Sequence, residues 1–109
     1  YQVNIPNFIT NKKVRLKTIL LNQSNIKKLN FKNKIVIIEN ADPGYDWIFS
    51  KKIGGLITKF GGANSHMAIR CAELSIPAAI GCGQKKYEDL KNSKNIELDC
   101  QSFNILYTK

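Results

Sequence analysis

The chain has 109 residues and a formal net charge of +9, with 43% hydrophobic and 23% charged residues. This length predicts a single domain, residues 1–109, with a modest core, and the composition is that of a soluble globular protein. The sequence contains neither the roughly 20 consecutive apolar residues of a membrane-spanning helix nor a recognisable signal peptide, so we expect no membrane partner. Because the first residue is Tyr1 and not a methionine, we expect a fragment of a larger multidomain protein.

The first third of the chain is strongly basic. Eight basic residues precede Glu39, the first acidic residue: Lys12, Lys13, Arg15, Lys17, Lys27, Lys28, Lys32 and Lys34. They could form an electropositive face for nucleotides, phosphorylated ligands or nucleic acid. Alternatively, they are solvated lysines that reflect a Lys-, Asn- and Ile-rich composition. Neither an interleaved aromatic platform nor a recognised nucleic-acid motif accompanies them, which favours the second interpretation and makes nucleic acid an unexpected partner.

The N-terminal half predicts two strands. Residues 14–20 partly alternate between apolar and polar side chains, which indicates a strand, and residues 22–30 predict a polar connection or short helix. Residues 35–38 are a β-branched run that is typical of a strand buried on both faces.

A helix and a third strand follow. Asp42 is a good N-cap and Pro43 suits the first helical position, so a helix is predicted to about Lys52. Gly54-Gly55 ends it, and residues 56–58 predict the next strand.

The pair Gly61-Gly62 then turns the chain into a second helix. Asn64 or Ser65 can cap this helix, and Pro77 must end it. Three apolar residues share a face that we expect to pack on a sheet: Ile69, Ala72 and Ile76.

The remaining elements complete an α/β domain. Residues 78–80 predict a strand, residues 87–91 a short helix, and residues 96–100 and 103–107 a closing pair of strands. The order strand–helix–strand–helix–strand over residues 35–80 predicts parallel pairing with helices packed on a central sheet. Ligands of such sheets bind beyond the carboxyl ends of the strands, where residues 59–66 are expected.

His66 is the only histidine of the chain, and it stands where the second helix begins. Imidazole has an ordinary pKa of about 6.5 and therefore an available lone pair at neutral pH, and the helix start offers amides and positive dipole to an anion. This combination predicts a phosphate-carrying histidine. Taken singly, these residues also have purely structural interpretations. His66 could form only a local hydrogen bond, Gly61-Gly62 could form only a turn, and Asn64 or Ser65 could serve only as the helix cap.

Several neighbours of His66 are candidates to hold a phosphoryl group. Gly61 and Gly62 let the backbone approach closely, and donors are expected from the Asn64 amide, the Ser65 hydroxyl and the backbone around Met67. Arg70 lies four residues after His66, on the same helical face, and is either a helper or a solvated arginine.

We expect none of the three cysteines to bind metal, form a disulfide or act as a nucleophile. Cys71, Cys82 and Cys100 include no CxxC pair, and neither a zinc site nor a disulfide framework fits them. We expect buried free thiols in a reducing cytoplasm and no metal in this domain. A nucleophilic pair of Cys71 with His66 is rejected, because a five-residue helical spacing points the two side chains apart.

Residues 61–69, Gly-Gly-Ala-Asn-Ser-His-Met-Ala-Ile, and residues 72–81, Ala-Glu-Leu-Ser-Ile-Pro-Ala-Ala-Ile-Gly, carry a family resemblance. Over residues 35–83 the chain resembles the mobile phosphohistidine domain of the phosphoenolpyruvate (PEP)-utilising enzymes, a group with pyruvate phosphate dikinase, PEP synthase and rifampin phosphotransferase. The resemblance implies a swivelling β/β/α domain in which His66 is transiently phosphorylated and Gly61, Gly62 and Ser65 surround it.

The resemblance also implies partners in the same polypeptide. One is an ATP-grasp-type nucleotide-binding domain, from which the histidine takes the β-phosphoryl group of ATP; the other binds the acceptor. Mg²⁺ and ATP, or PEP, belong to these partner domains, and no cofactor is expected in this one. With no nucleotide motif of its own, the chain alone is not expected to turn over ATP.

Three departures from the family pattern indicate a divergent bacterial branch. Asn64 replaces a frequent threonine, Ala72 a frequent arginine, and Glu39-Asn40 a basic-then-hydroxyl pair. They favour a small-molecule acceptor other than pyruvate, as in a glutamine kinase. Two alternatives remain open: a PEP-dependent relay of the synthase, dikinase or sugar-transport type, and a non-catalytic basic module that binds nucleic acid.

Overall fold

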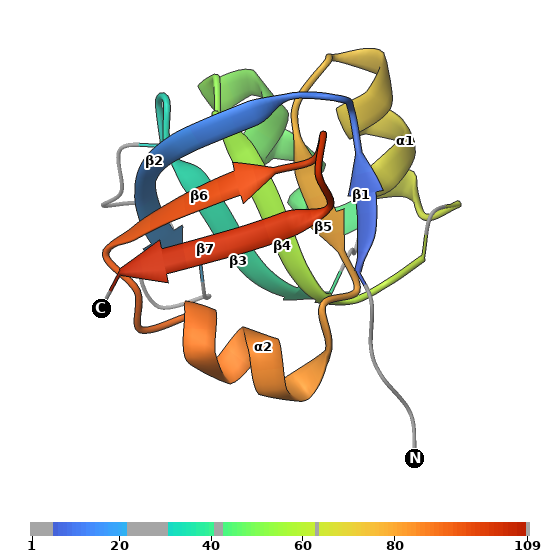
Figure 1. Ribbon diagram of the computed structural model, residues 1–109. Coiled ribbons are helices and arrows are strands. Elements are labelled where there is room, and N and C mark those ends of the chain that lie inside the picture. The colour runs from blue at the N-terminus through green and yellow to red at the C-terminus, as the bar shows by residue number, and fades with distance from the viewer. Residues whose placement is uncertain (1–5, 22–30, 41–42, 63, 109) are drawn as a thin grey trace.

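A computed structural model describes residues 6–21, 31–40, 43–62 and 64–108. One sheet of seven strands contains β1 (Asn7–Ile9), β2 (Lys13–Leu20), β3 (Ile35–Asn40), β4 (Gly55–Phe60), β5 (Ala78–Ile80), β6 (Asn95–Asp99) and β7 (Asn104–Thr108). The helical elements are the 3₁₀-helix η2 (Pro43–Lys51) and the α-helices α1 (His66–Glu73) and α2 (Gly83–Leu90). The predicted α/β class is confirmed (Figure 1).

The sheet has a parallel centre and antiparallel edges. Its strand order is β1-β5-β4-β3-β2-β6-β7. The strands β3, β4 and β5 pair in parallel, as the alternation of strands and helices over residues 35–80 predicts, and β2 also pairs parallel to β3. The strand β1 pairs antiparallel with β5, and the β6–β7 hairpin pairs antiparallel with β2. Only three residues long, β1 is too short to give a sequence pattern.

The strand β2 makes the sheet curl. Its first half, Lys13 to Lys17, pairs with β6, whereas its last residues, Thr18 to Leu20, pair with β3. One strand thus belongs to two pairings in succession, and the β6–β7 hairpin folds over the sheet (Figure 1).

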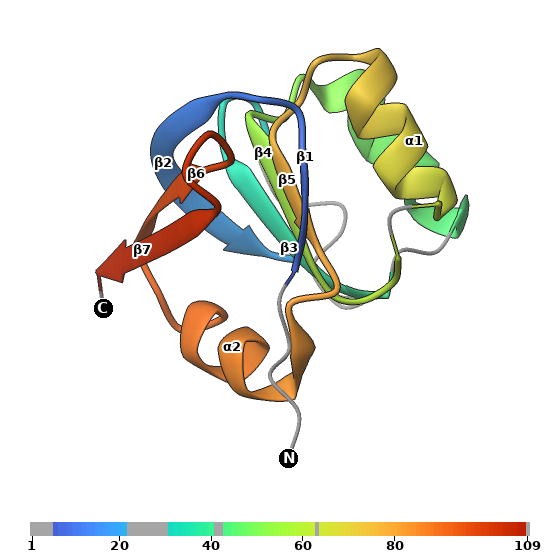
Figure 2. The ribbon, with the colours of Figure 1, turned by 45° about the vertical axis from the view of Figure 1, so that its right-hand side comes forward.

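Helices cover both faces of the sheet. Figure 2 shows α1 and η2 on one side and α2 on the other. Adjacent residues of β3 point to opposite faces: Val36 and Ile38 pack under α1 and η2, while Ile35 and Ile37 pack on the side of α2. The predicted strand with two buried faces is confirmed, since all four side chains are buried.

The prediction for the buried face of α1 is wrong. Ile69 is 51% exposed and Ala72 is exposed, and Ile76 lies beyond the helix, half-buried against the core. The buried side chains are Met67, Ala68 and Cys71. Apolar residues occur all around this short helix, so its periodicity fits two faces. The packing against β1, β5 and η2 selects one of them.

The other predicted elements hold with shifted ends. The helix predicted to Lys52 is a 3₁₀-helix that ends at Lys51, and its proposed cap, Asp42, lies outside the described residues, as does the connection 22–30. The last helix begins at Gly83 rather than Tyr87. The closing strands are each displaced by one residue from the predicted bounds.

Candidate active site

The loop that leads to His66 is anchored at the end of β4. Thr58 is fully buried, and its carbonyl accepts hydrogen bonds from the amides of Gly81 (3.1 Å) and Cys82 (2.9 Å). Its hydroxyl accepts from the Gly81 amide and donates to the carbonyl of Phe60, both at 2.9 Å. Because this buried hydroxyl is satisfied both as a donor and as an acceptor, it holds the last residues of β4 against the turn after β5.

Of the two glycines after Phe60, Gly61 passes very close to the backbone of Gly81, whereas Gly62 has open space around it. A Cβ atom on Gly81, which has φ of 78°, would lie 2.4 Å from the carbonyl oxygen of Gly61, so the two backbones pass closer than any side chain permits. Gly61 itself has φ of 131°. Gly62, by contrast, has open space within 4 Å of a Cβ position.

Ser65 caps α1. Its side chain accepts a hydrogen bond from the Ala68 amide at 3.3 Å, with extended φ and ψ of −68° and 157°. Of the two predicted caps, Ser65 is therefore the one used, and Asn64 is exposed in the turn before it. The Met67 side chain is fully buried, so only its backbone can face an anion.

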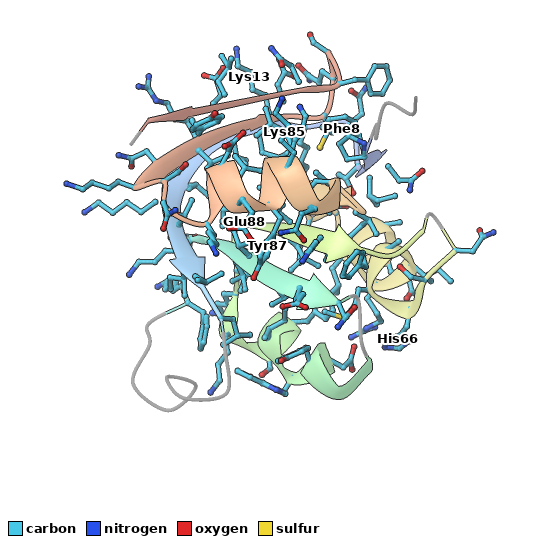
Figure 3. All side chains as sticks on the ribbon, turned by 90° about the horizontal axis from the view of Figure 1, so that it is seen from below. Phe8, Lys13, His66, Lys85, Tyr87 and Glu88 are labelled. Carbon is cyan, nitrogen blue, oxygen red and sulfur yellow. The ribbon has the colours of Figure 1, made fainter. Side chains whose placement is uncertain are left out.

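His66 is the first residue of α1, and its side chain is 44% exposed. Figure 3 shows it at the margin of the molecule, where α1 faces η2. Its Nε2 lies 2.9 Å from Oδ1 of Asp46 in η2. A carboxylate only accepts hydrogen bonds, so this contact assigns the ring proton to Nε2.

Arg70 contacts the same carboxylate oxygen. Its Nε lies 3.4 Å from Oδ1 of Asp46, its Nη1 lies 3.8 Å from Oε1 of Glu73, and its guanidinium carbon is 5.7 Å from the centre of the Phe49 ring. The structure therefore brings His66 and Arg70 together, as their spacing predicts, and joins them through Asp46.

Asp46 is the site residue that sequence reasoning missed. It lies 20 residues before His66 and reaches it only because η2 and α1 pack on the same face of the sheet. The available signal was its place in the first turn of the helix after Pro43, where acidic residues are common for structural reasons alone.

The cysteines lie away from this exposed site. All three are buried free thiols, as predicted. Burial raises the pKa of the Cys71 thiol to about 12 and that of Cys82 to about 11, so both stay protonated at neutral pH. Cys71 lies on the buried face of α1, whereas the His66 side chain is exposed. This arrangement agrees with the rejection of a Cys–His pair.

The part of the chain that the structure describes contains neither a metal-binding cluster nor a membrane-spanning helix. Within 6–21, 31–40, 43–62 and 64–108, no three His, Cys, Asp or Glu side chains are grouped so as to hold a metal ion. Over the same ranges, no helix has the length and apolar character needed to cross a membrane.

The basic residues of β2 form a solvated stripe. Lys13, Arg15 and Lys17 are exposed and alternate with the half-buried Val14 and Leu16. Lys13 forms an ion pair with the half-buried Glu97 at 4.0 Å, which contributes little because the lysine is exposed to solvent. Exposed lysines are what the composition-based interpretation predicts.

Comparison with known proteins connects this geometry to a family. The family model "PEP-utilising enzyme, mobile domain" matches residues 30–102. The phosphoenolpyruvate synthase of Escherichia coli strain K12 is 35% identical over 66 residues, 61% of this chain and 8% of its own length. That of Aeropyrum pernix is 35% identical over 78 residues, 69% of this chain and 9% of its own length. The chain thus spans less than a tenth of these relatives.

Proposed function

The chain belongs to the PEP-utilising enzyme mobile-domain family, and we propose that His66 is the residue on which it carries a phosphoryl group between two partner domains. The whole protein is then a phosphotransferase in which this domain supplies the carrier histidine. The 8–9% share of the phosphoenolpyruvate synthases that the chain matches supports further domains in the same polypeptide.

The observation that carries this proposal is an exposed imidazole at the positive end of a helix. Phosphoryl transfer needs little covalent help from a protein, but it needs fixed donors around the three equatorial oxygens. The amides of Ala68 and Ile69 donate to Ser65, which leaves those of His66 and Met67, in the same first turn, for such oxygens. Arg70 adds a cation beside the ring.

For the donor we propose ATP, through its β-phosphoryl group on a nucleotide-binding domain of ATP-grasp type that also holds Mg²⁺. The acceptor is a small molecule on another domain. PEP is the second candidate donor, because the relatives are named phosphoenolpyruvate synthases. Sequence supports a divergent acceptor, since Asn64 and Ala72 depart from the usual family residues.

A labelling experiment distinguishes these donors. The polypeptide that contains this domain is incubated with ATP labelled at the β-phosphate or with labelled PEP, and phosphohistidine is measured as acid-labile, alkali-stable label. We expect label from ATP on His66, and loss of at least 99% of it in His66→Ala. Because His66 is exposed, the melting temperature of that variant should remain within a few degrees of the wild type.

Three results would contradict the proposal. Label that persists in His66→Ala would exclude His66 as the carrier, and label from PEP alone would replace ATP as the donor. The 109-residue chain by itself should not hydrolyse ATP, so steady release of phosphate by the purified chain would contradict the division of labour between domains.

A further inference from the structure

The carboxylate of Asp46 occupies the direction in which a phosphoryl group on Nε2 must lie. Its Oδ1 is 2.9 Å from Nε2 and accepts the N–H of the ring. The N–H bond of an imidazole and a bond from the same nitrogen to phosphorus point in the same direction, in the plane of the ring. A carboxylate and a phosphoryl group therefore cannot both occupy this position.

Arg70 also faces the Asp46 carboxylate, but one of its side-chain donors has no well-aligned acceptor among the described residues. Its Nε atom is buried and has no hydrogen-bond partner among the described residues, although Oδ1 of Asp46 lies 3.4 Å away. The ion pair is therefore close but poorly aligned. A buried donor without an aligned acceptor is unfavourable, which indicates that the arrangement is completed by another anion.

We propose that a phosphoryl group on Nε2 of His66 displaces the Asp46 carboxylate and takes Arg70 as its own partner. This inference rests on the proposed carrier function and assigns two roles within it. Arg70 binds the phosphoryl oxygens. Asp46 is a positioning residue that holds the ring in the unphosphorylated form and opposes the phosphorylated one through its negative charge.

The chemical step requires the carboxylate to leave first. The ring proton then exchanges through solvent from Nε2 to Nδ1, and the Nε2 lone pair attacks phosphorus. A nitrogen–phosphorus bond forms as the bond from phosphorus to the leaving group breaks. With phosphoramidate as donor, ammonia leaves with the bonding electrons and takes up the ring proton as ammonium.

The charges of Asp46 and Arg70 should change the stability of the phosphohistidine in opposite directions. Asp46 places a negative charge beside a group that carries further negative charge, so it disfavours the phosphohistidine; Arg70 favours it. A purely structural role would instead make both substitutions change the reaction in the same direction. The sign of each effect therefore separates this proposal from a packing role.

The test uses phosphoramidate on the 109-residue chain, which needs no partner domain. We expect Asp46→Asn to raise the rate of His66 phosphorylation and the half-life of the phosphohistidine by roughly two- to five-fold, and Arg70→Gln to lower both by a similar factor. In the wild type, exchange of the Arg70 Nε–H proton with solvent, followed by ¹⁵N NMR, should slow on phosphorylation. Glu73→Gln is the matched control: it removes an equal charge, whose ion pair in the described part of the chain is with Arg70 and not with His66.

The outcomes separate this inference from the proposed function. Label on His66 with shifts of the same sign in Asp46→Asn and Arg70→Gln, or with no shift, overturns the inference and leaves the carrier function standing. Phosphorylation on Nδ1 also overturns it, since Asp46 need not then move. Failure to label His66, or equal labelling of His66→Ala, overturns both.

Discussion

The close contact of Gly61 with Gly81 shows how single residues shape the site. The two backbones meet at Gly61, in the loop that leads to His66, and a Cβ on Gly81 would collide with the carbonyl oxygen of Gly61 at 2.4 Å. Because the obstacle is backbone, the loop itself would have to move.

A matched pair of glycine substitutions tests this point. We expect Gly81→Ala to destabilise the domain by about 1–3 kcal/mol, because it adds both the collision and a strained positive φ. Gly62→Ala should change stability by less than about 0.5 kcal/mol, since its Cβ would meet open space. Urea unfolding measures both values, and equal destabilisation of the two variants would contradict the proposed support of the loop.

At this scale the sequence identified the residues whose roles are local. His66 at the helix start and Ser65 as its cap follow from adjacent residues, and both positions are confirmed. Asp46 and the buried Thr58 could not be identified, because their contacts join segments 20 and 23 residues apart. Only the packed sheet brings these segments together.

At the scale of elements, α1 is too short to be stable alone. Eight residues make two turns, well below the length at which an isolated helix forms in water. Its stability therefore comes from the Ser65 cap and from the burial of Met67, Ala68 and Cys71. Since His66 is its first residue, fraying of this helix would displace the imidazole.

Substitutions at Ser65 separate the cap from the charge of the site. Ser65→Ala should cost about 1 kcal/mol of stability, because the Ala68 amide loses its acceptor. Ser65→Asp keeps an acceptor and should restore stability, but its negative charge should lower the rate of His66 phosphorylation by roughly two- to five-fold. Thermal unfolding and phosphoramidate labelling measure the two effects; an Asp variant that is stable and labelled at the wild-type rate would contradict the expected anion site.

The sequence located α1 and η2 but did not settle their details. Pro43 predicted the start of the first helix, and Pro77 predicted that the second helix ends before it. The buried face of α1 was predicted incorrectly, because the sequence offered two apolar faces. The 3₁₀ geometry of η2 was not predicted either, since the helix-forming residues of 43–51 do not distinguish it from an α-helix.

At the scale of the whole molecule, the central strands connect two hydrophobic clusters. Alternate residues of β3 and β4 belong to opposite clusters, one under α1 and η2 and the other under α2. Neither cluster can lose its packing without disturbing the same strands. We therefore expect the domain to unfold in one cooperative transition.

The single tryptophan provides a test of this coupling. Trp47 packs on the cluster under α1 and η2 and lies edge-to-face with Phe31 at 5.6 Å between ring centres. Leu90→Ala, in the opposite cluster, should lower the urea midpoint reported by Trp47 fluorescence, at a cost of about 2–5 kcal/mol. The exposed Lys85→Ala on the same helix is the control. A Trp47 transition unaffected by Leu90→Ala would show that the two faces unfold independently.

The sequence by itself determined the α/β class, the parallel order of the central strands and the position of His66 at a capped helix start. These properties follow from short-range patterns: β-branched runs, capping residues, glycines and prolines. Tertiary structure alone decided which face of α1 is buried, how β2 curls into a second pairing, and that Asp46 stands between His66 and Arg70. Those features depend on contacts between segments distant in the chain, which no local pattern specifies.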